Sequence, residues 1–125
     1  MNDANSWDWS RPIFDHVHLR VADLERSRAF YVATLEPLGI PLLLDTPHLV
    51  QFANLALSAE STPSTGVHVA FVARSREEVD AFHAAGLAAG GTDHGAPGPR
   101  DYGPYAAYVL DPDGTNLEAA FRSWG

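Results

Sequence analysis

The sequence predicts an α+β domain built from two copies of one module, in which a strand and a helix are followed by three further strands. Three observations lead to this fold class. A segment of the chain repeats, alternating apolar residues precede a helical pattern in each copy, and short strand-like segments follow each helix. We expect residues 1–125 to form a single domain, with module one at about residues 12–60, a linker at 61–66 and module two at about 67–123.

The repeat is ungapped at a shift of 52 residues. It places His16–Gly39 on His68–Gly91 with 8 identities in 24 positions, where roughly two would arise from average composition. Two unrelated strand–helix units would also look alike, but both copies begin with a histidine and end with a glycine. We therefore interpret the match as an internal duplication.

In module one, Asp15–Val21 alternates as a strand does, and Asp23 is placed to cap the helix that follows. Gly39 ends that helix. Its inward face is expected to hold Leu24, Phe30, Tyr31, Thr34, Leu35 and Leu38. The three following strands are expected at Ile40–Leu44, His48–Ala53 and Leu55–Ala59.

In module two, the first strand is expected at Val67–Ala73, and Ser75 with Glu78 predicts a capping box for a helix that ends at Gly90–Gly91. A weak strand near Thr92 and a long loop over Thr92–Pro104 come next. The last two strands are expected at Tyr105–Leu110 and Thr115–Arg122, joined by a turn at Asp111–Gly114. If that turn is a simple four-residue one, Ala107 and Val109 lie beside Glu118.

Strand alternation assigns the polar residues to one face. With Leu19 toward the first helix, His16, His18 and Arg20 share the opposite face, and His68 and Glu118 lie on the corresponding face of module two. Two histidines and one carboxylate are suitable ligands for a catalytic divalent metal ion. Half-buried strand histidines and a solvated acid are the alternative interpretation of these residues.

Composition excludes several classes of protein. The chain has 16 acidic and 8 basic residues, a net charge of −8, so neither nucleic acid nor a membrane surface is an expected partner. It has no cysteine, which excludes disulfides and thiolate ligands. With no signal core and no apolar run near the ~20 residues of a membrane span, we expect a cytoplasmic protein.

Three segments together resemble the vicinal oxygen chelate superfamily, which includes glyoxalase I, bleomycin-resistance proteins and extradiol dioxygenases. They are FDHVHLRVADLERSRAFY, VHVAF and LDPDGTNLEAAF, and the resemblance covers about Ile13 to Phe121. The chain looks most similar to a single-domain, glyoxalase-like subgroup. The resemblance implies two βαβββ modules that form a curved, mixed eight-stranded sheet around a metal cleft.

The resemblance also implies which positions hold the metal: His16, Ala56, His68 and Glu118. Ala56 departs from the four-ligand glyoxalase I pattern, where a glutamate at this position takes part in proton transfer. Glyoxalase I activity is therefore not expected. The three remaining ligands imply a divalent ion (Zn, Fe, Mn, Ni or Co).

His18 is a candidate general base or a residue that orients a ligand, and Arg20 is a candidate anchor for an anionic substrate group or a partner of Glu118. The expected function is a metal-dependent lyase, isomerase or dioxygenase acting on a small molecule with vicinal oxygens. A metal-free protein that binds a small molecule, as bleomycin-resistance proteins do, is the alternative. We expect a homodimer, because the two modules leave open sheet edges.

Overall fold

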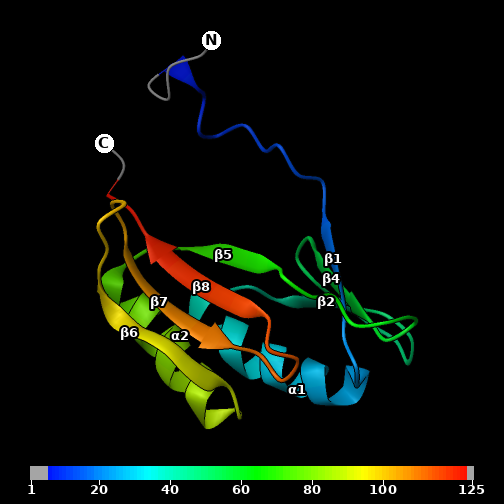
Figure 1. Ribbon diagram of the computed structural model, residues 1–125. Coiled ribbons are helices and arrows are strands. Elements are labelled where there is room, and N and C mark those ends of the chain that lie inside the picture. Colours follow the sequence, from blue (N-terminus) through cyan, green and yellow to red (C-terminus); the bar gives the residue numbers. More distant parts are fainter. Residues whose placement is uncertain (1–5, 124–125) are drawn as a thin grey trace.

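A computed structural model describes residues 6–123 and shows two helices and eight strands as the main elements of this part of the chain (Figure 1). The outermost residues of the predicted single domain, 1–5 and 124–125, lie outside the described residues. Neither described helix is long and apolar enough to cross a membrane. The strands are β1 (Val17–Arg20), β2 (Leu42–Asp45), β3 (Val50–Phe52), β4 (Leu55–Ser58), β5 (His68–Ala73), β6 (Thr92–Pro99), β7 (Tyr105–Leu110) and β8 (Asn116–Phe121). The helices are α1 (Leu24–Leu35) and α2 (Arg76–Ala88), and a 3₁₀ turn, η2 (Glu36–Leu38), follows α1.

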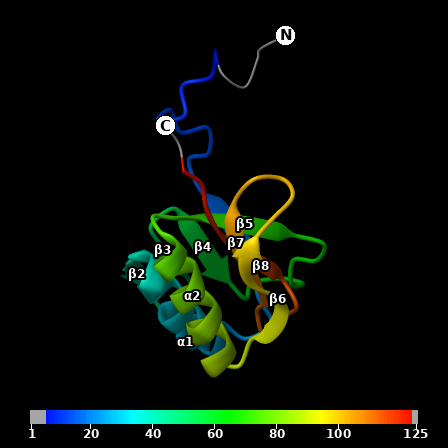
Figure 2. The same ribbon diagram turned by 90° about the vertical axis from the view of Figure 1, so that its left-hand side faces the viewer.

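The strands form two mixed four-stranded sheets with the same topology. Their orders are β1-β4-β3-β2 and β5-β8-β7-β6, and only the first pair of each is parallel. The predicted α+β fold of two βαβββ modules is thus confirmed. Hydrogen bonds do not join the two sheets in the described chain, and β1 and β5 each form an edge. Helices α1 and α2 pack against each other, and each packs against the sheet of its own module (Figure 2).

Helix α1 begins where the sequence predicted, but it ends at Leu35, and the 3₁₀ turn η2 continues the chain to Gly39. The Asp23 carboxylate accepts a hydrogen bond from the Arg26 backbone N–H at 3.1 Å, and Gly39 has a φ of +71°, a left-handed conformation that favours glycine. All six residues predicted for the inward face are buried. The helical period of the apolar residues was therefore a sufficient guide to this face.

Tertiary contacts explain why helix α2 contains a glycine. A Cβ at Gly86 would stand 3.1 Å from a methyl group of Val109 on β7. The missing side chain lets the helix lie close to the sheet, which offsets the cost of glycine in a helix, about 1 kcal/mol. At the helix start, Ser75 caps the Glu78 N–H as predicted, while the Glu78 carboxylate reaches the Arg74 N–H.

The predicted long loop of module two is mostly a strand. Residues Thr92–Pro99 form β6, which pairs with β7 through two register irregularities near Gly95. Glycine and proline are tolerated because β6 is an edge strand. The connecting loop shrinks to residues 100–104.

The turn before β8 is one residue longer than the simple turn considered above. Leu110 pairs with Asn116, and Tyr108 therefore lies opposite Glu118. The expectation for Ala107 and Val109 was wrong: both are fully buried in the core. A shift of one residue transfers every side chain of a strand to the other face, and so Tyr108 takes their place beside Glu118.

The buried carboxylate of Asp111 sets this turn and ties the modules together. Its Oδ1 accepts the backbone N–H groups of Asp113 and Thr115, at 2.8 and 2.9 Å. Its Oδ2 accepts the hydroxyl of Tyr31 on α1, at 2.6 Å. Burial first, and then the Asp111 charge, raise the pKa of Tyr31 well above its ordinary value, so this phenol remains a donor.

We predict that Tyr31→Phe lowers the free energy of unfolding by about 1–3 kcal/mol, because it leaves a buried carboxylate oxygen without its donor. Tyr105→Phe is the matched control, since Tyr105 makes the same kind of bond to Asp80, at 2.7 Å, on the exposed surface. Its effect should be near zero. Urea unfolding of both variants measures the difference, and equal effects would contradict the role of Asp111.

Candidate metal centre

The candidate centre is a histidine–carboxylate pair on the sheet of module two. His68 starts β5 and Glu118 lies on the adjacent strand β8, and alternation directs both away from α2 as predicted. His68 Nε2 lies 2.9 Å from Glu118 Oε1. The His68 side chain is 45% exposed, but the Glu118 side chain is only 4% exposed. The predicted face is therefore not open at Glu118.

Two tyrosines cover Glu118. The Tyr102 hydroxyl donates to Glu118 Oε2 and is hydrogen-bonded to the Tyr108 hydroxyl. The Tyr108 ring lies 6.0 Å from the His68 ring, centre to centre. Removal of the Tyr102 hydroxyl from water, followed by its bond to Glu118, raises the pKa of Tyr102 far above the ordinary value. The phenol is therefore a donor at neutral pH.

Sequence reasoning missed the roles of both tyrosines. Tyr102 stood in a loop whose path the strand pattern did not predict, and Tyr108 was assigned to the wrong face by the four-residue turn. The available signal was Asp111, whose side chain can accept from a backbone N–H group two residues later and lengthen the turn.

His16, His18 and Ala56 line a separate hollow on module one. Asp15 and Gln51 also contribute to it. His16 Nδ1 lies 2.8 Å from Asp15 Oδ2, and its side chain is 59% exposed. His18 Nε2 lies 2.7 Å from the Ser58 hydroxyl, and His18 is opposite Ala56 in the parallel β1–β4 register.

Arg20 is exposed at the end of β1, where its backbone N–H donates to the Ser64 hydroxyl at 2.9 Å. Glu118 is paired with His68 and Tyr102, which both belong to its own module. Arg20 of module one is therefore not its partner. Within residues 6–123, no three His, Cys, Asp or Glu side chains are grouped closely enough to hold a metal ion. Within one chain, His68 and Glu118 therefore lie together, while His16 and His18 lie in a separate hollow.

The pair in module two has donors that suit a divalent ion. The observed separation of 2.9 Å is that of a hydrogen bond. Two ligands at about 2.1 Å from a tetrahedral ion lie about 3.4 Å apart, so a small movement of the two side chains would admit an ion. Imidazole nitrogen and a carboxylate oxygen are both suitable for Zn, Fe, Mn, Ni or Co. Tyr102 holds the second carboxylate oxygen and leaves Oε1 toward His68.

The fold is that of a known superfamily. The family model described as Glyoxalase/Bleomycin resistance protein/Dioxygenase superfamily matches residues 13–119. The chain therefore belongs to this superfamily. No match was found among the curated proteins compared.

Solved structures agree with this membership. The chain is 36% identical to a glyoxalase/bleomycin resistance protein from Albidiferax ferrireducens T118, with a TM-score of 0.77, covering 90% of this chain and 100% of that one. A lactoylglutathione lyase from Agrobacterium tumefaciens is 22% identical, with a TM-score of 0.64, over 89% of this chain and 94% of that one. The second likeness concerns the fold alone.

Proposed function

We propose that this protein is a metal-dependent enzyme of the vicinal oxygen chelate type, acting on a small molecule with two adjacent oxygen atoms. The observation that carries the proposal is the His68–Glu118 pair, with its 2.9 Å separation between two donors of suitable chemistry. Glu118 is a buried carboxylate with Tyr102 on one oxygen and the accessible imidazole of His68 beside the other, so an ion at that second oxygen would have both side chains as ligands. Superfamily membership supports the same function.

We further propose that a homodimer completes the site. His68 and Glu118 of one chain would combine with His16 of the partner, because one chain holds these residues in separate hollows. Edge strands β1 and β5 are open, and Val72 on β5 is 77% exposed. Both features favour association with a second copy.

A divalent ion held by these three ligands would stabilise negative charge developing on the substrate oxygens. The chain's own residues would transfer protons and bind the substrate. His18 would accept or return a proton, held in orientation by the Ser58 hydroxyl. Arg20, exposed on the same strand, would bind an anionic group of the substrate.

The first test is metal content. We expect tag-free protein to hold about one divalent ion per chain and His68→Ala to lose it, because a three-ligand site does not retain its ion with two. His83→Ala is the matched control, since His83 Nε2 makes a similar contact, 2.9 Å from Asp93 Oδ1, between α2 and β6. Elemental analysis after dialysis measures both. Equal loss in the two variants, or metal-free wild type, would refute the metal site.

The second test asks whether the ligands come from two chains. His16→Ala and His68→Ala should each bind no metal alone. When the two variants are unfolded and refolded together in equal amounts, about half of the dimers are mixed. Each mixed dimer rebuilds one of its two sites, so the mixture should regain about a quarter of the wild-type sites. A mixture that stays empty while wild type binds metal would show that the site forms within one chain.

The third test concerns the reaction. We expect no appreciable turnover of the methylglyoxal–glutathione adduct with Zn, Ni or Co, because Ala56 cannot act as a base and its neighbour Ser58 is a poor one at neutral pH. An Ala56→Glu variant that gains this activity would support the assignment of position 56. Strong wild-type turnover that His18→Ala abolishes would show instead that His18, the base proposed above, also serves this reaction despite Ala56.

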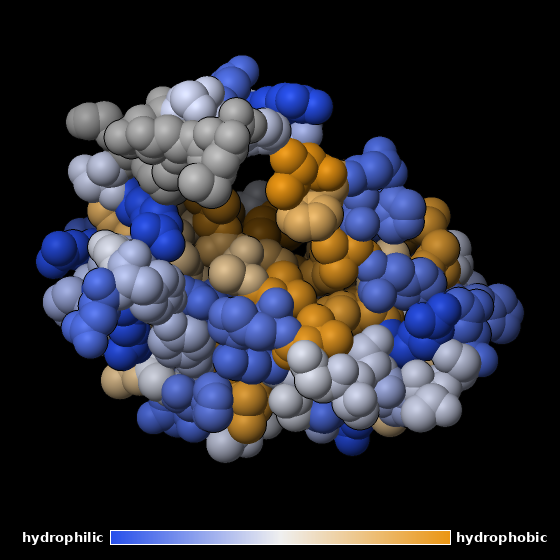
Figure 3. Space-filling view, turned by 45° about the horizontal axis from the view of Figure 1, so that its top comes forward, coloured by the Kyte–Doolittle hydropathy of each residue, from blue (hydrophilic) through white to orange (hydrophobic). Residues whose placement is uncertain are grey.

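A metal-free binding protein is the second candidate, and one feature favours it. A hollow between the modules is lined mainly by apolar residues, among them Phe14, Phe52, Leu55 and Phe71. Figure 3 shows hydrophobic residues gathered around a hollow on one face of the molecule. Such a surface suits an apolar ligand, and a protein that binds only through it would keep its affinity in His68→Ala.

A further inference from the structure

We infer that Tyr102 is a positioning residue of the proposed metal site. It holds one oxygen of Glu118 away from the ion, so that Glu118 binds through a single oxygen and leaves coordination positions for both oxygens of the substrate. This inference rests on the function proposed above. The two carboxylate oxygens have different partners: Oε2 accepts the Tyr102 hydroxyl, whereas Oε1 lies 2.9 Å from His68 Nε2.

Packing alone does not fix the orientation of the Glu118 carboxylate. The side chain borders a hollow of about 190 Å³. Its neighbours on that face of the sheet, Ala70 on β5 and Ala120 on β8, are too small to confine it. Because the carboxylate has room to turn, hydrogen bonds set its orientation, and Tyr102 donates the one that holds Oε2.

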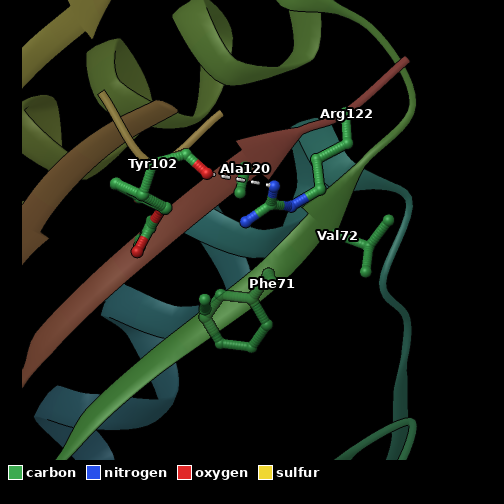
Figure 4. A pocket seen from close by; sticks show the side chains of 7 residues that line it. Phe71, Val72, Tyr102, Ala120 and Arg122 are labelled. Carbon is green, nitrogen blue, oxygen red and sulfur yellow. Dashed lines mark hydrogen bonds between the residues drawn. The ribbon is translucent and has the colours of Figure 1, made fainter. Parts of the chain in front are cut away.

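Tyr102 is itself held in place by its loop and by Arg122. The Arg122 guanidinium lies over the Tyr102 ring, 5.7 Å from the ring centre, and donates to the Tyr102 carbonyl at 3.5 Å (Figure 4). The loop is closed by two backbone hydrogen bonds, from the Arg100 N–H to the Pro104 carbonyl at 2.9 Å and from the Gly103 N–H to the Arg100 carbonyl at 3.0 Å. These contacts keep the phenol against Glu118.

The number of Glu118 oxygens on the ion decides how many coordination positions the protein fills. A carboxylate can bind a metal ion through one oxygen or through both. With one oxygen of Glu118 and two imidazoles as ligands, the protein fills three positions, and a catalytic site of this kind keeps the others open. A fourth protein donor, Oε2, would compete with the second oxygen of a chelating substrate. The hydrogen bond from Tyr102 to Oε2 therefore favours a substrate that binds through two adjacent oxygens.

Cobalt-loaded protein provides the first measurement, because Co²⁺ is among the ions expected at this site and its visible absorption weakens as its coordination number rises. We expect Tyr102→Phe to bind Co²⁺ with weaker visible absorption than wild type, since Oε2 is released and can reach the ion. Tyr102 is 53% exposed and the variant keeps its ring, so it should fold. Tyr105→Phe is the matched control, because it removes the same kind of bond, to Asp80 at 2.7 Å, on the α2 side of β7.

The second measurement compares two probes of the open coordination positions, added to the cobalt-loaded proteins. Acetohydroxamate binds a metal ion through two oxygens, whereas azide binds through one atom. We expect Tyr102→Phe to bind acetohydroxamate about tenfold or more weakly than wild type does, because one of the two contacts is lost, and to keep its affinity for azide. Tyr105→Phe should match wild type with both probes.

The outcomes separate this inference from the function on which it rests. Wild-type protein that takes up no Co²⁺ would refute the proposed metal site, and the role of Tyr102 with it. If wild type binds Co²⁺ but Tyr102→Phe keeps the wild-type spectrum and the wild-type affinity for acetohydroxamate, the role of Tyr102 is overturned and the metal site stands. Equal changes in Tyr102→Phe and Tyr105→Phe would also overturn that role, because Tyr105 is bonded to Asp80 and not to Glu118.

Discussion

The carboxylate of Asp111 is the group on which the geometry of module two depends. It accepts two backbone N–H groups of its own turn and the Tyr31 hydroxyl from module one. The first two bonds set the length of the turn and hence the register of β8 against β7. The third holds α1 against that turn. A single buried charge thus sets the position of Glu118 and contributes to the contact between the modules.

The register of β8 has a chemical consequence. It puts Tyr108 rather than Val109 beside Glu118, and Tyr102 from the adjoining loop completes a chain of hydroxyl groups that ends on the carboxylate. A buried carboxylate needs such donors, since an unpaired charge in a protein interior is costly. The same donors leave one oxygen of Glu118 directed at His68, the arrangement on which the proposed metal site rests.

Because the module is duplicated, the candidate functional residues lie on two separate faces. Module one carries His16, His18 and Ala56 around one hollow, and module two carries His68, Glu118 and the pocket that ends at Arg122. Within residues 6–123, neither face groups three side chains that could hold a metal ion. The proposed homodimer would bring ligands from the two faces together.

The sequence by itself determined the two modules, the buried face of α1 and the shared face of His68 and Glu118. These features depend on local periodicity, which is 3.6 residues in a helix and two in a strand. Only the tertiary structure decided that Tyr102 and Tyr108 cover Glu118, that residues 92–99 pair as an edge strand, and that Gly86 is required where α2 meets Val109. Each of these depends on a contact between distant elements, or on one residue of turn length, and neither leaves a periodic pattern in the chain.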